Sequence, residues 1–333
     1  SEEELIEVFN ERAYDVILLG SDAVFHLSAR DLTEDLRFPN PFWLLWVDER
    51  LAGSPFRAVL AASSMGTQFF RLPKPTRAGV RRAWQRMEFL SVRDQWTRWS
   101  VAFLTRGRLW PRLCPDPTSV LNDVLDRAAE DDAEAASLDG RYILLSLPAV
   151  ALREDWLDAL VREAHALGYL VFGLALPEGD CPQGVDRVIG HPLDPLAWYA
   201  WIRHAAGVIA TRFHPAVCSI FNGVPLVSLD YGVWFPKGLV EIRIPSKTYD
   251  VCRRAGTRRA CLTPRQLRRL APADVLGLLE VQRRTRTLTY AARAREEFRR
   301  TVAALLRAAE QSRRGHHSHA SAAVASRRVA EGQ

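Results

Sequence analysis

The chain has little lysine, little methionine and no long apolar run. Only three of its 333 residues are lysine and two are methionine. The longest apolar runs, at 16–19 and 169–176, have the length of strands and fall well short of the ~20 residues that a membrane span needs. No basic segment followed by an apolar stretch opens the chain, so we predict no signal peptide. Composition is ordinary, with 48% hydrophobic and 25% charged residues, which excludes a disordered chain, and the length suggests about two domains.

Motifs for metals, disulfides and nucleotides are also missing. The five cysteines are odd in number and widely spaced, and no C-x-x-C is present. A disulfide framework or structural zinc site is therefore not expected, and a reducing cytoplasm is the simplest location. We find no Gly-rich nucleotide loop of the G-x-G-x-x-G or Walker type. We expect no metal and no cofactor.

Charge is unevenly distributed along the chain. The net charge is +6, but residues 251–333 contain 19 Arg and six acidic residues, which leaves the first 250 residues at −7. The basic C-terminal helix has three interpretations: a solvated surface, contact with an anionic membrane at its inner face, or nucleic-acid binding. Nucleic acid ranks last, because aromatic residues do not alternate with the basic ones. We expect no nucleic-acid partner.

Strand-like and helix-like segments alternate, and the pattern restarts near residue 140. Such alternation predicts an α/β fold in which helices cover both faces of parallel sheets. We expect two Rossmann-like domains facing a cleft, at 1–138 and 139–314, and a disordered tail at 315–333. We also expect the N-terminal domain to be incomplete. Because ligands of such sheets bind at the carboxyl ends of strands, residues just after strands are the best candidates for a site.

The strongest candidate segment is 208–215, a strand that ends in Arg212, Phe213 and His214 and is followed by Pro215. Proline favours the first turn of a helix, which places His214 at a helix N-terminus, a natural anion site. Arg212 adds a planar fork suited to phosphate or carboxylate. A buried histidine and an ion-paired arginine explain the pattern equally well.

Other strands also end in polar residues. Ser21 and Asp22 follow Gly20, and they are suited either to sugar hydroxyls or to capping the next segment. Arg93 follows a strand, and Asp94 is either its partner or the N-cap of the next helix. The turns at 63–66 and 114–117 each carry little information alone.

In this order, the segments resemble the polysaccharide pyruvyl transferase family. The motifs are Asp-x-(three apolar)-Gly-Ser-Asp at 15–22, Ser-Met-Gly at 64–66, Ser-Val-Arg-Asp at 91–94, Asp-Pro at 116–117, Thr-Arg-Phe-His at 211–214 and Gly-Val-Pro at 223–225. The resemblance spans residues 14–232, and Arg-x-His followed by Gly-x-Pro is its most specific part.

The resemblance implies a fold similar to the GT-B glycosyltransferases. It implies transfer of an enolpyruvyl group from phosphoenolpyruvate to two sugar hydroxyls of a cell-surface polysaccharide or its precursor, free or lipid-linked, giving a pyruvate ketal. Arg212 and His214 match the catalytic positions. The remaining implied substrate contacts are Arg93, Ser64, Gly66, Ser21, Asp22 and Asp230.

The chain departs from the family pattern in three places. The usual Gly-rich strand–turn–helix at the start is missing, and Ala-Val-Phe follows Asp22 where many relatives have Gln-Val-Trp. Lys237 lies six residues after Tyr231 rather than three, so we assign it no role. Two alternatives stay open: a nucleotide-sugar glycosyltransferase of similar architecture, or a truncated, non-catalytic relative that binds glycan.

Overall fold

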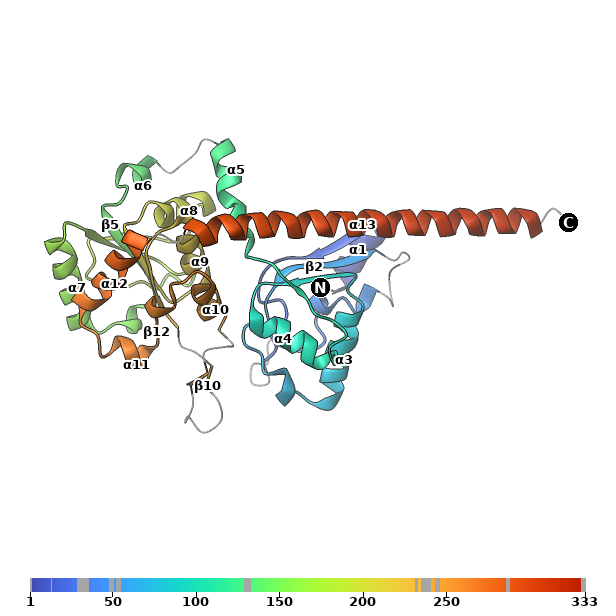
Figure 1. Ribbon diagram of the computed structural model, residues 1–333, viewed down its shortest axis with the longest axis horizontal. Coiled ribbons are helices and arrows are strands. Elements are labelled where there is room, and N and C mark those ends of the chain that lie inside the picture. The colour runs from blue at the N-terminus through green and yellow to red at the C-terminus, as the bar shows by residue number, and fades with distance from the viewer. Residues whose placement is uncertain are drawn as a thin grey trace. The chain divides into compact units, whose positions relative to one another are not determined.

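The computed structural model describes residues 2–12, 14–28, 36–47, 51, 55–128, 133–230, 233–234, 241–242, 246–285 and 288–330. The chain forms two compact units (Figure 1). Unit 1 comprises residues 1–115 and 297–333, and unit 2 comprises residues 116–296. Each unit contains a parallel sheet with helices packed on it. The prediction of two α/β domains with parallel sheets is therefore confirmed.

Unit 1 is built on a four-stranded parallel sheet in the order β1-β2-β3-β4. Its strands are β1 (Val16–Leu19), β2 (Phe56–Ala62), β3 (Phe89–Val92) and β4 (Arg112–Leu113). Its helices are α1 (Glu2–Arg12), η2 (Pro41–Trp43), η3 (Phe69–Arg71), α3 (Lys74–Gln85), α4 (Gln95–Leu104) and the later part of α13 (Leu288–Ala330). Right-handed crossovers between neighbouring parallel strands place α3 and α4 on the same face of the sheet.

The two faces of this sheet have separate cores. On one face, Val80 and Trp84 of α3 pack in the same apolar cluster as Val101 and Leu104 of α4. On the other face, Leu305 of α13 packs on residues of β2. Figure 1 agrees, since α3 and α4 lie together on the side of β2 away from α13. Unit 1 is thus a sheet with helices packed on both of its faces. This packing fixes the strands, and with them the carboxyl edge of the sheet.

Unit 2 is built on a six-stranded parallel sheet in the order β12-β9-β8-β5-β6-β7. Its strands are β5 (Tyr142–Ser146), β6 (Leu170–Leu174), β7 (Arg187–Ile189), β8 (Gly207–Ala210), β9 (Leu226–Leu229) and β12 (Cys261–Leu262), beside a separate antiparallel pair of β10 (Val233–Trp234) and β11 (Glu241–Ile242). In chain order this is the strand order of a doubly wound Rossmann sheet, and the order reverses between β5 and β8. That reversal is where such sheets bind ligands.

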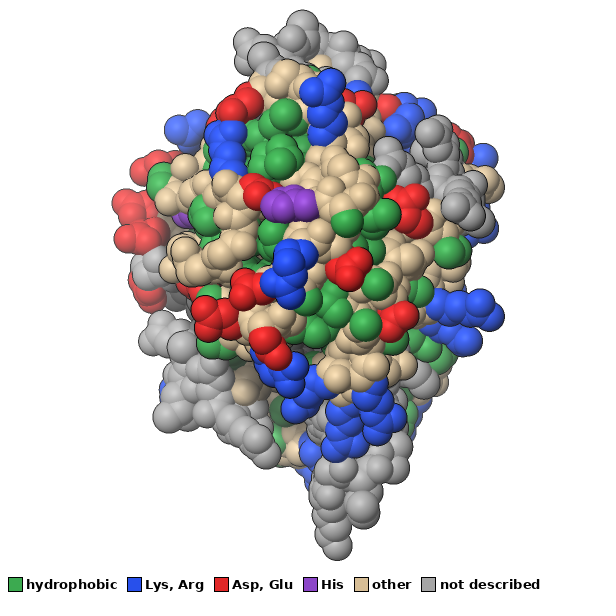
Figure 2. Space-filling view, turned by 90° about the vertical axis from the view of Figure 1, so that its left-hand side faces the viewer, with side chains coloured by type: hydrophobic (Ala, Val, Ile, Leu, Met, Phe, Trp, Pro, Cys, Tyr) green, Lys and Arg blue, Asp and Glu red, His purple; other side chains and the backbone are tan. Residues whose placement is uncertain are grey.

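Helices cover both faces of the sheet in unit 2. They are η4 (Pro117–Val120), α5 (Leu121–Ala128), α6 (Ala133–Ser137), η5 (Ala149–Ala151), α7 (Glu154–Ala166), α8 (Pro195–Arg203), α9 (Phe213–Asn222), α10 (Lys247–Arg254), η6 (Arg258–Ala260), α11 (Pro264–Leu267), α12 (Pro272–Thr285) and the start of α13. α8 and α9 belong to one core and α7 and α12 to the other. The side of unit 2 drawn in Figure 2 carries basic and acidic side chains intermixed with apolar ones.

The structure differs from the expected boundaries in two places. Residues 116–138, which we assigned to the first domain, belong to unit 2, because Leu125 and Ala135 are buried in its core beside Tyr199. Helix α13 continues through Ala330, where we expected a disordered tail from 315. Among the described residues, no helix combines the length and the apolar character that crossing a bilayer requires.

Candidate functional site

The carboxyl edge of the sheet in unit 1 brings the ends of β1, β2 and β3 together. Arg93, directly after β3, donates from Nη1 to the carbonyl oxygen of Ser21 (2.6 Å) and from Nη2 to Oδ1 of Asp22 (3.0 Å). The amide of Ser63, after β2, donates to the carbonyl of Asp22 (2.9 Å). The adjacent candidates Ser21 and Asp22 therefore meet the distant candidate Arg93 at one edge, where the ends of parallel strands come together.

The candidate side chains at this edge differ in how far they are exposed to solvent. The Arg93 side chain is 1% exposed, whereas that of its partner Asp22 is 69% exposed. Ser64 is fully buried, and its amide and hydroxyl both contact the Thr97 hydroxyl, at 2.8 and 2.9 Å. As placed, Asp22 faces solvent, while the Arg93 and Ser64 side chains hold the edge together from inside.

Asp94 caps the helix that follows β3. Its Oδ1 accepts a hydrogen bond from the Thr97 amide (2.8 Å), which makes it the N-cap of α4. Two nearby residues adopt left-handed backbone that costs energy for non-glycine side chains: Ala61 at φ 53° and Met65 at φ 48°. Gly66 follows at φ 78°. Such backbone strain concentrates at functional turns, so the turn at 63–66 is held in an unusual conformation beside Asp22.

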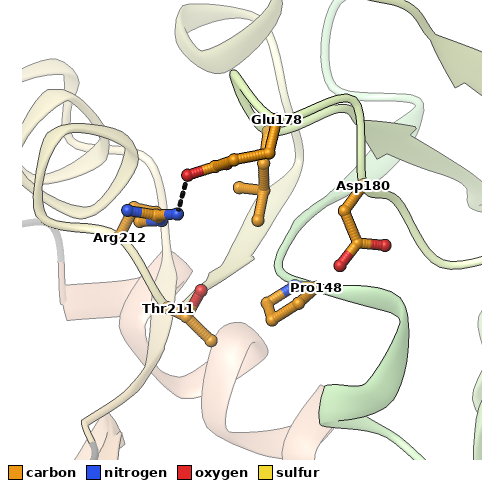
Figure 3. A pocket seen from close by; sticks show the side chains of 6 residues that line it. Pro148, Glu178, Asp180, Thr211 and Arg212 are labelled. Carbon is orange, nitrogen blue, oxygen red and sulfur yellow. Dashed lines mark hydrogen bonds and ion pairs between the residues drawn. The ribbon is translucent and has the colours of Figure 1, made fainter.

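In unit 2, the carboxyl edge of the sheet carries an open cavity of about 450 Å³ at the reversal between β5 and β8. The residues that line it follow three strands: Pro148 after β5, Leu176, Glu178 and Asp180 after β6, and Thr211 and Arg212 after β8. Figure 3 shows Arg212 and Glu178 reaching toward each other, with Asp180 and Pro148 on the other side. The cavity therefore lies where a Rossmann sheet binds its ligands.

Arg212 is half-exposed and paired in this cavity. Its Nη2 donates to Oε1 of Glu178 at 2.5 Å, with 54% and 58% of the two side chains exposed. The hydrogen bond from the backbone of Glu178 itself and the guanidinium of Arg212 lower the pKa of the Glu178 carboxyl, and His191 adds to the same direction. The guanidinium is thus at the surface, held by a carboxylate that stays ionised.

Helix α9 begins directly after Arg212. Phe213 is its first residue, two positions earlier than the start that Pro215 indicated. His214 is exposed in this first turn, and its ring contacts the Phe213 ring edge-on at 5.6 Å. The unsatisfied amides and the dipole of a helix N-terminus favour an anion beside it. Arg212 and His214 therefore flank the first residue of α9 at an electropositive helix N-terminus, and of the two Arg212 lines the cavity.

Asp230 occupies the same edge but is buried. It follows β9, is 9% exposed, and its amide donates to the carbonyl of Leu262 (2.7 Å). The thiol of Cys261 contacts its Oδ2 at 3.9 Å. Lys237 lies outside the described residues. Lys247 of α10, which the sequence analysis did not single out, lies near the start of α9. Its ammonium is 5.0 Å from the centre of the Phe213 ring.

Glu178 and Asp180 are the residues that sequence reasoning missed. Both follow the strand predicted at 169–176, so the rule applied to Arg212 and Asp22 covers them as well. Asp180 also fixes the cavity wall, because its Oδ1 accepts a hydrogen bond from the Ala149 amide (3.2 Å). Within the described ranges, no group of three or more His, Cys, Asp or Glu side chains is placed to hold a metal ion.

Comparison with solved structures finds distant likenesses to enzymes that act on sugars. One is the UDP-GlcNAc 2-epimerase of Methanocaldococcus jannaschii, 11% identical over 85% of this chain and 74% of that one, with a TM-score of 0.49. A second is the ADP-heptose LPS heptosyltransferase II of E. coli, 12% identical over 86% and 81%, with a TM-score of 0.41. A third is the spinosyn forosaminyltransferase SpnP, 13% identical over 93% and 80%, with a TM-score of 0.45.

The comparison with protein families is specific. A search of the curated proteins finds no match. The family model described as polysaccharide pyruvyl transferase matches residues 3–232, which is more than half of the chain and includes both Arg93 and the Arg212–His214 segment. The chain therefore belongs to the polysaccharide pyruvyl transferase family, a family of transferases.

Proposed function

We propose that the protein transfers the enolpyruvyl group of phosphoenolpyruvate to sugar hydroxyls of a polysaccharide or its precursor, forming a pyruvate ketal. Family membership supports the reaction class. The observation that carries the proposal is the position of Arg212, which lines an open cavity on the carboxyl edge of a Rossmann-ordered sheet, with His214 exposed in the first turn of the helix that follows it. Phosphoenolpyruvate has a phosphate and a carboxylate, and this position favours both.

The chemistry assigns a role to each group. Protonation of the enol carbon makes the neighbouring carbon electrophilic, a sugar oxygen bonds to it, and the bond to the phosphate oxygen breaks. Attack by a second hydroxyl on the same carbon closes the ketal, so one phosphate is released for each ketal formed. Arg212 binds an anionic group of the donor, and His214 acts either as general acid or as a stabiliser of the departing phosphate.

The remaining candidates are assigned by exposure. We propose that Asp22 and the turn of Ser21 contact the acceptor sugar, because the Asp22 carboxylate is exposed and can accept hydrogen bonds from hydroxyls. Gly66 lets the neighbouring turn approach a ligand closely. Arg93, Ser64 and Asp230 are buried, so we propose that they support the site by holding strand ends in place. A cytoplasmic location, where phosphoenolpyruvate is made, is part of the same proposal.

The decisive experiment uses purified protein, phosphoenolpyruvate and a candidate glycan acceptor, with phosphate release and the ketal product measured separately. Arg212→Ala and His214→Asn should each lower turnover at least about a hundredfold while the thermal midpoint stays unchanged. The matched controls lie at the amino ends of the strands of the same sheet, away from the cavity. They are Arg187→Ala, which removes another half-exposed Arg–Glu pair, and His165→Asn, which removes another exposed histidine. Both controls should stay within about twofold of the parent.

Three outcomes contradict the proposal. Full turnover in both site variants on a confirmed substrate shows that the site is wrong. Binding of a uridine or guanosine diphosphate sugar, without response to phosphoenolpyruvate, indicates a glycosyltransferase instead. Glycan binding in calorimetry without phosphoenolpyruvate binding indicates a non-catalytic relative.

A further inference from the structure

A basic surface on unit 1 is not used by the proposed site. Residues 71–112 contain eleven Arg and Lys against two acidic residues, whereas residues 1–70 and 113–250 each carry net negative charge. Both acidic residues are engaged: Glu88 pairs with Arg57, and Asp94 is buried as the cap of α4. The exposed basic side chains of this stretch are Arg71, Lys74, Arg82, Arg106, Arg108 and Arg112. The charge that reaches solvent here is therefore almost entirely positive.

Three large aromatic side chains are exposed within the same stretch. Trp99 and Phe103 are 44% and 63% exposed, and because they lie four residues apart on α4 they are neighbours on one face of the helix. Trp110 is 56% exposed, and the guanidinium of Arg98 on α4 lies 4.6 Å from its ring centre. This contact joins the segment after α4 to the helix. We call Trp99, Phe103 and Trp110, with Arg106, Arg108 and Arg112, the α4 surface.

The α4 surface donates hydrogen bonds but offers few acceptors. Residues 95–112 contain no Asp, Glu, Asn or His, Gln95 at the start of α4 is half-buried, and Thr97, Ser100 and Thr105 are buried. Arginine and tryptophan side chains only donate. Recognition of sugar hydroxyls uses acceptors as well as donors, so a neutral glycan is a poor match. A partner rich in anionic oxygens is a good match.

The exposed aromatics narrow the choice of anionic partner. Trp and Phe on one side of a helix, next to arginines, are typical of helices that lie in a membrane interface. Trp prefers the headgroup level, and arginine is attracted to anionic lipid. A bilayer offers phosphates at its surface and hydrocarbon just beneath, which matches both components of the α4 surface. A dissolved polyanion such as a nucleic acid offers phosphates to the arginines but has no continuous apolar layer for the aromatic side chains.

The C-terminal helix, which the charge pattern first suggested for membrane contact, lacks this combination. In residues 297–314 of α13, the aromatic residue Phe298 is buried, and the exposed large apolar residue is Leu306. One acidic residue of this helix, Glu297, lies near the α4 surface. Burial lowers the pKa of Arg98, and the Glu297 carboxylate opposes that shift. Arg98 already interacts with Glu297 and with the Trp110 ring, and we leave it out of the lipid contacts.

We propose that the α4 surface docks the protein on an anionic membrane, with Trp99 and Phe103 in the interface and the exposed arginines on lipid phosphates. This attachment is peripheral. It places unit 1 at the bilayer whether or not the proposed transfer reaction is correct.

The test is co-sedimentation of the full-length protein with phosphatidylcholine vesicles made with or without phosphatidylglycerol. The parent should bind only the anionic vesicles, and added salt should weaken the binding. Trp99→Ser combined with Phe103→Ser should reduce partitioning at least about tenfold, as should Arg106→Glu combined with Arg108→Glu. Because all four side chains are exposed, the variants should keep the parent's thermal midpoint.

Matched controls lie on unit 2 and on α13. Val150→Ser with Val281→Ser removes two other exposed apolar side chains, and Arg258→Glu with Arg259→Glu reverses two other exposed arginines. Both should bind like the parent, as should Arg299→Glu with Arg300→Glu on α13. The proposal is wrong if the Trp99/Phe103 variant binds like the parent, or if the α13 variant alone loses binding. It is also wrong if single-stranded RNA at equal phosphate concentration displaces the protein from vesicles, because nucleic acid is then the better partner.

Discussion

Arg93 and Arg212 occupy equivalent positions in two different sheets, and the structure gives them opposite environments. Each follows a strand at the carboxyl edge of a parallel sheet. Arg93 is buried and donates to Ser21 and Asp22, whereas Arg212 is half-exposed at a cavity and pairs with Glu178. Position after a strand therefore predicts which edge a side chain reaches, but not whether it faces a ligand or the fold itself.

The difference suggests that Arg93 stabilises the fold and Arg212 binds a ligand. By tying the end of β1 to the end of β3, Arg93 acts as a positioning residue that keeps Asp22 at the surface. Arg212 has no such structural duty, because its partner Glu178 is itself exposed and the pair contributes little to stability. Substitutions at the two positions should therefore separate folding from ligand binding.

The largest expected effect is on the stability of unit 1. Arg93→Ala removes two hydrogen bonds and leaves a cavity, so it should lower the free energy of unfolding by about 2–4 kcal/mol. Arg212→Ala should change it by less than about 0.5 kcal/mol. The buried free cysteines report on each unit separately, since Cys114 belongs to unit 1 and Cys218 to unit 2.

Thiol labelling followed by peptide mass analysis measures this difference. Arg93→Ala should speed labelling of Cys114 roughly 30- to 800-fold, if labelling follows the population of the opened state. Labelling of Cys218, whose pKa burial raises, should be unaffected. Equal acceleration at both cysteines would show that Arg93 does not act on unit 1 alone.

A smaller effect is expected at Asp94, where the sequence left two roles open. Asp94→Ala removes the N-cap of α4 and the acceptor for the Thr97 amide, so unit 1 should lose about 1–2 kcal/mol of stability. Asp94→Asn should recover most of this loss, because an amide oxygen also caps. If Asp94 were instead the charge partner of Arg93, the asparagine variant would be as unstable as the alanine variant. Urea denaturation of the three proteins distinguishes these cases.

The positions of most strands could be predicted from the sequence, because apolar runs mark them directly. Five polar strand ends were identified in this way, and the structure joins Ser21, Asp22 and Arg93 at one edge. What local patterns do not encode is the partner across the chain. The partner of Arg93 is 71 residues upstream rather than its neighbour Asp94.

The domain boundary was misjudged for the same reason. Helices α5 and α6 lie in an acidic segment, and a local helix pattern does not reveal the sheet on which a helix packs. The contacts that settle it are long-range: Asn122 bonds to Asn222, and the Tyr199 hydroxyl donates to Asn122. Glu178 was not predicted although it closely follows a predicted strand, because an anionic substrate favours cationic rather than acidic side chains as candidates.

The smallest expected effect concerns the carboxylate that holds Arg212. Glu178→Gln removes the charge that competes with an anionic ligand for the guanidinium, so calorimetry should show phosphoenolpyruvate binding tighter by about twofold to fivefold, the range of an exposed ion pair. Glu134→Gln is the matched control. Arg187 lowers the pKa of Glu134 through a hydrogen bond, as Arg212 contributes to lowering that of Glu178, but the pair lies at the opposite edge of the sheet.

The pH dependence gives this prediction its sign. A lowered pKa keeps Glu178 ionised, and competing, throughout the neutral range and into mild acid. The advantage of the glutamine variant should therefore be full above the usual range of carboxylic acids and shrink as the pH falls through the lowered pKa of Glu178, where the parent loses the same charge. Because titration of the ligand affects parent and variant equally, the ratio of their affinities isolates Glu178. A constant ratio across this range means that Glu178 does not compete for Arg212, and the guanidinium then meets its anion without leaving the carboxylate.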